Sequence, residues 1–290
     1  MSAIARLDTA RSIAACPLCG NAAAAAHTLP HAEARRCPSP DCGLRFADPQ
    51  PDDAALRDAY RSLYYPDPDA SPADPPSEIV DWDETPPGTL QELMETIAPR
   101  VRGAAPARLL DYGCGRGALG RAAREAGFDV VGVELDDEAR RAAKSGAGLR
   151  AHADLAALRR NEPDARFDVI TIWQVIEHLR RPWDDLVSLR EMLAPDGFLV
   201  IATPNAKCLR ARMEGARWEN VANPTHLYYF TEPSLRRVLQ GSGLETVERL
   251  HIPAAYPHHG ALRRAAQRVL RACDLEGDVV LVARRARAVG

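Results

Sequence analysis

The 290-residue sequence has none of the long apolar runs that mark a membrane protein. No stretch approaches the roughly 20 apolar residues that a membrane-spanning helix needs. The first fifteen residues contain two arginines but no continuous apolar segment, so they do not resemble a secretory signal. We therefore expect a cytoplasmic protein without a membrane partner.

An excess of charge of one sign is also missing. The formal net charge is −3 and the isoelectric point is near 6.3, so no overall field draws the chain toward phosphate polymers. An RNA-binding enzyme is expected to show a basic stripe with aromatic residues, and here basic side chains gather only in short groups at 35–45 and 263–271. A small-molecule partner is favoured over a nucleic acid, and these features do not predict an oligomeric state.

The chain divides into three zones by composition. Four cysteines cluster near the N-terminus, and seven prolines with many acidic residues follow in residues 64–90, a composition that favours neither helix nor strand. We predict a cysteine-rich extension at 1–63, a linker at 64–88 and a main domain at 89–290, with a lid at 204–230 and a cap at 251–277.

The main domain alternates short apolar runs with helical patterns. This alternation is typical of a parallel sheet with crossover helices, and continuous apolar runs such as VVGV and VITI suit strands buried on both faces. The last two strands, LETVERL and DVVLVAR, end the domain like a hairpin. We predict an α/β, Rossmann-like doubly wound fold whose seven-stranded sheet has one reversed strand.

The clustered cysteines have the spacing of a metal site. Cys16 and Cys19 form one pair and Cys37 and Cys42 a second, with 17 residues between the pairs, and each pair is followed by glycine. Four thiolates in two tight turns can surround a structural zinc and leave no open coordination position. The other three cysteines are expected to be unpaired thiols.

A glycine-rich turn follows the first strand of the main domain. Residues 109–120 read LLDYGCGRGALG, so Gly113 and Gly115 lie where a strand passes into a helix and where a ligand can approach the backbone. The same residues also fit the dinucleotide pattern G-x-G-x-x-G/A. Asp111 argues against a pyrophosphate, because its charge repels one but suits the positively charged end of an amino-acid-bearing ligand.

Two further acids follow later strands. Glu134 ends the strand VVGV, where its carboxylate can accept both hydrogens of a ribose diol, whereas Asp136 and Asp137 read as solvated acids that begin the next helix. Asp154 follows a short strand and can accept from an adenine amine, or it can simply cap the following helix.

These motifs, in this order, resemble the class I S-adenosylmethionine-dependent methyltransferases over about residues 107–250. The resemblance implies that S-adenosylmethionine is the cofactor. It also implies that the glycine turn holds the methionine portion, that Glu134 holds the ribose and that the segment after the fourth strand lies beside the sulfonium. The cofactor-binding residues implied by the resemblance are Asp111, Gly113, Gly115, Glu134, Asp154, Leu155, Trp173 and Gln174.

Two histidines are candidates for a catalytic base, which methyl transfer needs only when the acceptor loses a proton. His178 lies in QVIEHL, where Glu177 and His178 can instead form a structural pair, and His226 lies among aromatic residues in NPTHLYYF. Ubiquinone-type O-methyltransferases show a similar stretch with an acid in place of Gln174, so we do not expect a divalent metal there.

The cysteine-rich segment resembles an N-terminal zinc-ribbon extension on bacterial methyltransferases that act on sugars, surface glycans and secondary metabolites. We therefore predict methylation of a small molecule, with a hydroxyl as the favoured acceptor. The alternative is an RNA methyltransferase that grips nucleic acid with the ribbon. A third hypothesis, a binding protein without turnover, is disfavoured by the Trp173–Gln174 segment and the histidine in the lid.

Overall fold

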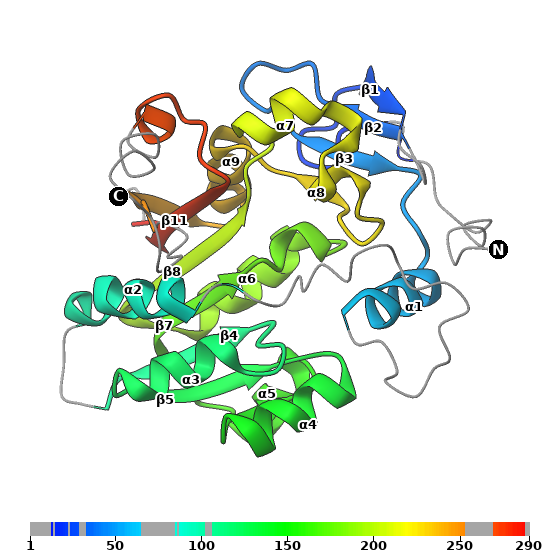
Figure 1. Ribbon diagram of the computed structural model, residues 1–290. Coiled ribbons are helices and arrows are strands. Elements are labelled where there is room, and N and C mark those ends of the chain that lie inside the picture. The colour runs from blue at the N-terminus through cyan, green and yellow to red at the C-terminus, as the bar shows by residue number, and fades with distance from the viewer. Residues whose placement is uncertain are drawn as a thin grey trace.

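The computed structural model describes residues 13, 15–22, 24–28, 33–64, 85, 87–101, 106–252 and 269–287. A large and a small sheet organise these residues (Figure 1). The large sheet has the strand order β10 (Leu244–Leu250), β11 (Asp278–Arg285), β8 (Leu193–Pro204), β7 (Phe167–Trp173), β4 (Arg108–Tyr112), β5 (Asp129–Val133) and β6 (Arg150–His152).

One strand of this sheet is reversed. β11 runs antiparallel to β8 and β10, whereas β8, β7, β4, β5 and β6 pair in parallel. The predicted seven-stranded sheet with one reversed strand is therefore confirmed. Since the carboxyl ends of parallel strands meet at one edge, the loops after β4, β5 and β7 are brought together there.

Helices cover both faces of the large sheet. Neighbouring strand residues Val169 and Ile170 point to opposite faces and belong to different apolar clusters. The cluster with Val169 contains side chains of α2 (Pro87–Ile97), α3 (Ala118–Glu125) and α4 (Asp137–Gly146). The cluster with Ile170 contains side chains of α5 (Leu155–Asn161), α6 (Pro182–Met192) and α9 (Glu232–Gly241). The sheet is thus the middle of three layers.

The small sheet joins the cysteine-rich extension to the main domain. Its antiparallel order is β1 (Ala24–Thr28), β2 (Glu33–Arg36), β3 (Arg45–Asp48) and β9 (Tyr228–Tyr229). The last strand comes from the predicted lid, which also contains α7 (Leu209–Glu214), η4 (Gly215–Arg217) and α8 (Glu219–Ala222). Figure 1 shows this sheet beside α7 and α8, above α1 (Asp53–Tyr64).

The ends of the predicted linker are helical. α1 continues to Tyr64 and α2 begins at Pro87, because proline is well tolerated in the first turn of a helix. Residues 65–84 and 86 of the linker, and residues 253–268 of the predicted cap, lie outside the described part of the chain. Within the cap, a helical turn occupies residues 269–272.

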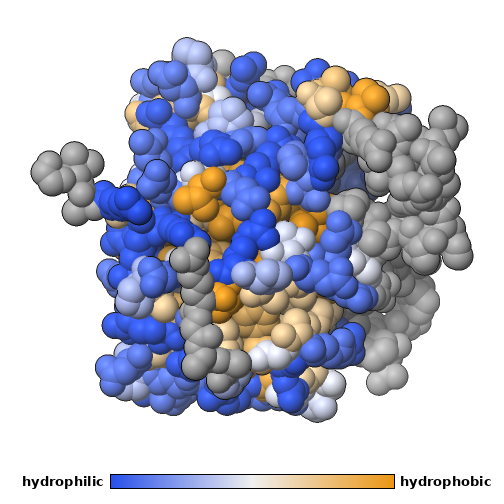
Figure 2. Space-filling model, turned by 90° about the vertical axis from the view of Figure 1, so that its left-hand side faces the viewer, coloured by the Kyte–Doolittle hydropathy of each residue, from blue (hydrophilic) through white to orange (hydrophobic). Residues whose placement is uncertain are grey.

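The helices and the surface are both consistent with the absence of long apolar runs in the sequence. Among the described residues, every helix is too short or too polar to cross a membrane. The face shown in Figure 2 is largely hydrophilic, with a hydrophobic area near its centre.

Candidate functional site

The glycine turn after β4 adopts a conformation that requires glycine. Gly113, Gly115 and Gly117 have φ angles of 79°, 50° and 91°, a region that side chains with a Cβ rarely adopt. A Cβ at Gly113 would also lie 2.3 Å from Cγ2 of Val175. The amides of Gly113 and Cys114 donate to the Val133 carbonyl at 2.8 and 3.0 Å, so the turn is fixed to the end of β5.

Glu134 connects this turn to the next loop. Its side chain is 3% exposed and accepts hydrogen bonds from the amides of Gly115 at 2.9 Å and Asp136 at 2.8 Å. A carboxylate has about four acceptor positions, and these two bonds orient it toward the glycine turn. Asp136 caps α4 through the amides of Glu138 and Ala139, as predicted for an acid at a helix start.

Asp111 lies beneath the turn rather than at its surface. It is 2% exposed, and Oδ1 accepts from Thr171 Oγ1 at 2.9 Å. Desolvation raises the pKa of this carboxyl to about 7, and the bond from Thr171 opposes the rise. The bond from Thr171 on β7 fixes the Asp111 carboxyl below the turn.

The other predicted cofactor residues lie at the same edge of the sheet with different partners. Asp154 caps α5, with Oδ1 accepting from the Ala157 amide at 2.6 Å. The indole of Trp173 donates to Thr85 Oγ1 at 3.0 Å. Gln174 has a φ of 56°, and its amide donates to Asp278 Oδ1 at 3.1 Å. The structure thus shows that Asp154 caps a helix, and the contact of Asp154 and Leu155 with adenine stays a prediction.

The two candidate histidines lie together although 48 residues separate them in sequence. Their rings meet edge to face, with centroids 4.6 Å apart. Nδ1 of His178 lies 3.1 Å from the Thr225 carbonyl, and Nδ1 of His226 lies 2.9 Å from the Asn220 carbonyl. A carbonyl only accepts, so each Nδ1 carries a proton, and a neutral ring of this tautomer has its lone pair at Nε2. Burial lowers the pKa of His178 to about 4.

Glu177 completes this cluster. One ligand atom each of Glu177, His178 and His226 lies within 4.8 Å of the others. Glu177 is 1% exposed; Oε2 accepts from Thr203 Oγ1 at 2.9 Å, and Oε1 has no hydrogen-bond partner among the described residues. Gln174 bonds to Asp278 and does not join this cluster, and the expected absence of a divalent metal there stays a prediction.

Burial raises the pKa of Glu177 to about 8, so the carboxyl is protonated at neutral pH. The folded state then holds a proton that the unfolded state, with a pKa near 4.3, releases. The contribution of Glu177 to the free energy of unfolding should be most favourable below about pH 4 and should fall as the pH rises to about 8, by at most roughly 5 kcal/mol. We expect Glu177→Gln, which mimics the protonated acid, to reduce this fall.

Urea unfolding of the wild type and of Glu177→Gln at pH 5 and pH 9 measures the effect. The variant should match the wild type at pH 5 and be more stable at pH 9. An equal decline in both proteins would show that Glu177 is ionised throughout.

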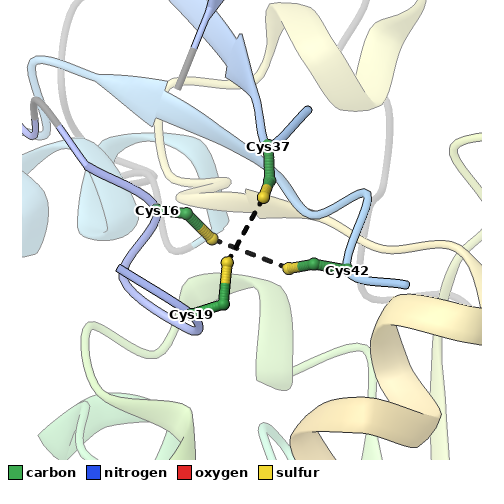
Figure 3. Close-up of side chains that lie close together, drawn as sticks. All are labelled: Cys16, Cys19, Cys37 and Cys42. Atoms are coloured by element: carbon green, nitrogen blue, oxygen red, sulfur yellow. Dashed lines mark hydrogen bonds between the residues drawn. The ribbon is translucent and has the colours of Figure 1, made fainter. Parts of the chain in front are cut away.

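The four clustered cysteines converge on one point (Figure 3). Their Sγ atoms lie within 4.8 Å of one another, with 3.7 Å between Cys16 and Cys42 and 3.4 Å between Cys19 and Cys37. A tetrahedral zinc with Zn–S bonds of about 2.3 Å separates its sulfurs by about 3.8 Å. The four thiols therefore fit a closed tetrathiolate site. The other cysteines, at 114, 208 and 273, are free, as expected.

The sequence interpretation missed a second layer of residues around the histidines. Tyr60 and Tyr64 of α1 meet the His178 ring edge to face, with centroids 5.7 and 5.8 Å away. Asn223 donates to Tyr64 Oη at 2.9 Å. The repeated tyrosines in AYRSLYY were a visible signal, but nothing in their spacing indicated which part of the main domain they would contact.

Comparisons with known proteins agree with this geometry. A 1,6-didemethyltoxoflavin-N1-methyltransferase from Burkholderia thailandensis, solved with that substrate and S-adenosylhomocysteine, has a TM-score of 0.53 at 19% identity and covers 91% of this chain and 99% of its own. An S-adenosylmethionine-dependent methyltransferase from Mesorhizobium loti has a TM-score of 0.50 at 19% identity, and the match covers 68% of this chain and 98% of that protein. At these identities the likeness shows the fold.

Curated relatives are similar over the main domain. A ubiquinone biosynthesis O-methyltransferase from Cereibacter sphaeroides is 32% identical over 158 residues, covering 49% of this chain and 62% of the relative. One from Thiobacillus denitrificans is 31% identical over 190 residues, which cover 60% of this chain and 78% of the relative. The chain thus spans less than two thirds of the first of these relatives.

A family model described as a methyltransferase domain matches residues 82–249, more than half of the chain. This range contains the glycine turn, Glu134 and the His178–His226 pair. The chain therefore belongs to this methyltransferase domain family.

Proposed function

We propose that the protein transfers a methyl group from S-adenosylmethionine to a hydroxyl group of a small molecule. The observation that carries the proposal is the joining of the glycine turn to Glu134 at the sheet edge where the histidine pair also lies. A site for the cofactor and a candidate base for the acceptor thus lie at one edge.

The chain's own groups would hold the cofactor in the following way. Gly113 and Gly115 let the backbone approach its methionine portion, Asp111 supports the turn from below, and Glu134 accepts from the ribose diol. Asp154 and Leu155 would border the adenine, and Trp173 and Gln174 would lie beside the sulfur. The bound cofactor supplies an already activated methyl group, so the protein has to align the acceptor and exclude water.

A hydroxyl acceptor must lose its proton during transfer, and the histidine pair is placed to take it. We assign the base to Nε2 of His226, because Nδ1 of that ring is held by the Asn220 carbonyl. His178 packs against His226 and orients it. The low pKa of His178 keeps that ring neutral at physiological pH.

The acceptor class follows from the relatives. The two curated relatives are ubiquinone biosynthesis O-methyltransferases, which supports a small hydroxylated metabolite, glycan precursor or sugar over RNA. The tetrathiolate cluster is proposed to hold a structural zinc, because four thiolates fill all four positions of a tetrahedral ion.

Calorimetric titration with S-adenosylhomocysteine, together with metal analysis of the same sample, tests both sites. We expect micromolar binding and one zinc per chain, with no binding of NAD as the control. Binding of NAD in place of S-adenosylhomocysteine would overturn the assignment of the glycine turn, and a metal-free, fully folded sample would overturn the zinc site.

A further inference from the structure

The cysteine-rich extension is bonded directly to the segment that carries His226. Arg45 pairs with Tyr229 and Phe46 with Tyr228 across β3 and β9, and the Ala47 amide donates to the Leu227 carbonyl at 3.0 Å. The strand of the extension therefore runs along the residues that immediately follow His226.

The opposite side of the same segment is bonded to the main domain. The Leu227 amide donates to the Glu177 carbonyl at 2.8 Å, and Thr225 donates to Asn223 Oδ1 through its amide and its hydroxyl. His226 is thus held between the extension and the 3₁₀ helix η3 (Ile176–His178).

Helix α1, which follows β3, lies against His178. Besides the ring contacts of Tyr60 and Tyr64 with His178, Arg180 bonds to Asp53 Oδ1 at 2.9 Å and to the Pro51 carbonyl at 2.6 Å. Arg61 reaches Asp136 at 3.6 Å, two residues after the proposed ribose acid. α1 thus extends from the histidines to the proposed cofactor loop.

The metal cluster and this helix share one apolar core. Cys16, Cys37 and Cys42 lie in the same buried cluster as Phe46 and Tyr228, and Leu56 of α1 packs against that cluster. α1 contains no buried residue of its own, so its position depends on these edge contacts and on the strand that precedes it.

We propose that α1 is the cover of the acceptor site, that Tyr60 and Tyr64 are positioning residues which shield the histidine pair from water, and that the metal-bound cysteine turns hold this cover in place. The inference rests on the proposed function, since methyl transfer to a hydroxyl requires a base site from which water is excluded. Loss of the metal or of the two rings then uncovers the histidines and leaves the cofactor site intact.

Modification of histidines by diethyl pyrocarbonate, followed by mass spectrometry, tests the proposal without an acceptor. In the full-length Tyr60→Ala/Tyr64→Ala protein, His178 should react on the order of tenfold faster than in the wild type. Tyr60→Phe/Tyr64→Phe keeps the rings and should stay protected, and Asp58→Ala, an exposed position on the same helix, is the matched control. His251, which contacts Glu276 outside the histidine cluster, is the internal reference.

Removal of the metal by chelation should raise the reactivity of His178 in the same way. S-adenosylhomocysteine affinity should stay within about twofold of the wild type in the chelated protein and in both tyrosine variants. Unchanged protection of His178 in Tyr60→Ala/Tyr64→Ala would overturn the proposed cover. Unchanged protection after complete metal loss would overturn the role of the cysteine turns. Failure of the wild type to bind S-adenosylhomocysteine would instead contradict the proposed function.

Discussion

Glu134→Ala should weaken the binding of S-adenosylhomocysteine by about 100-fold or more, because each hydrogen bond to a charged group contributes roughly 1.5–3 kcal/mol and the diol supplies two. The variant also loses the acceptor of the Gly115 and Asp136 amides, so the turn itself loses its support. Calorimetry measures the affinity directly.

Two further variants test whether the loss of affinity comes from the carboxylate of Glu134. Glu134→Gln keeps one acceptor oxygen and should lose affinity by an intermediate factor of about 10. Glu125→Ala removes an exposed acid from α3 and should bind like the wild type. Unaltered affinity in a folded Glu134→Ala protein would remove the ribose assignment.

Replacing His226 should lower turnover by two or more orders of magnitude, the usual range for loss of a general base, with cofactor affinity nearly unchanged. His226→Asn is the safer variant for folding, since its amide can still donate to the Asn220 carbonyl as Nδ1 does. Initial rates of methyl transfer to a panel of hydroxylated acceptors, measured beside S-adenosylhomocysteine affinity, check the prediction.

His178→Ala and His251→Ala complete this series. His251 contacts Glu276 outside the cluster, and its replacement should leave the rate unchanged. Wild-type turnover in His226→Asn together with a large loss in His178→Ala would move the base to His178, and wild-type turnover in both would show that no histidine of the pair acts as base.

Much of the fold could be predicted because local patterns specify it. The apolar runs at β4, β5 and β7 set buried strands, and the glycines at 113, 115 and 117 specify a turn that other residues cannot adopt. The strands before β10 alternate with helices and were therefore predicted to be parallel. The reversed strand was predicted at the hairpin-like end of the domain, which is formed by β10 and β11. Helix α1 was not predicted from the sequence, and its last residue, Tyr64, lies in the stretch expected to form the linker.

The candidate site was only partly predictable. Glu134 was identified because it ends a buried strand, and the cysteines because their spacing is short and regular. The hydrogen-bond partners of Gln174 and Glu177, which are Asp278 and Thr203, could not be predicted. Both partners come from strands that are distant in sequence, and the register of the sheet decides which side chains meet.

The sequence by itself determined the individual strands of the main domain, the glycine turn and the four-cysteine cluster, because each depends on residues that are close in the chain. Tertiary structure decided which of these act together. It paired His178 with His226, added β9 to the sheet of the extension and placed α1 against His178. Such contacts join segments that are far apart in sequence, and only the packing of the whole chain selects them.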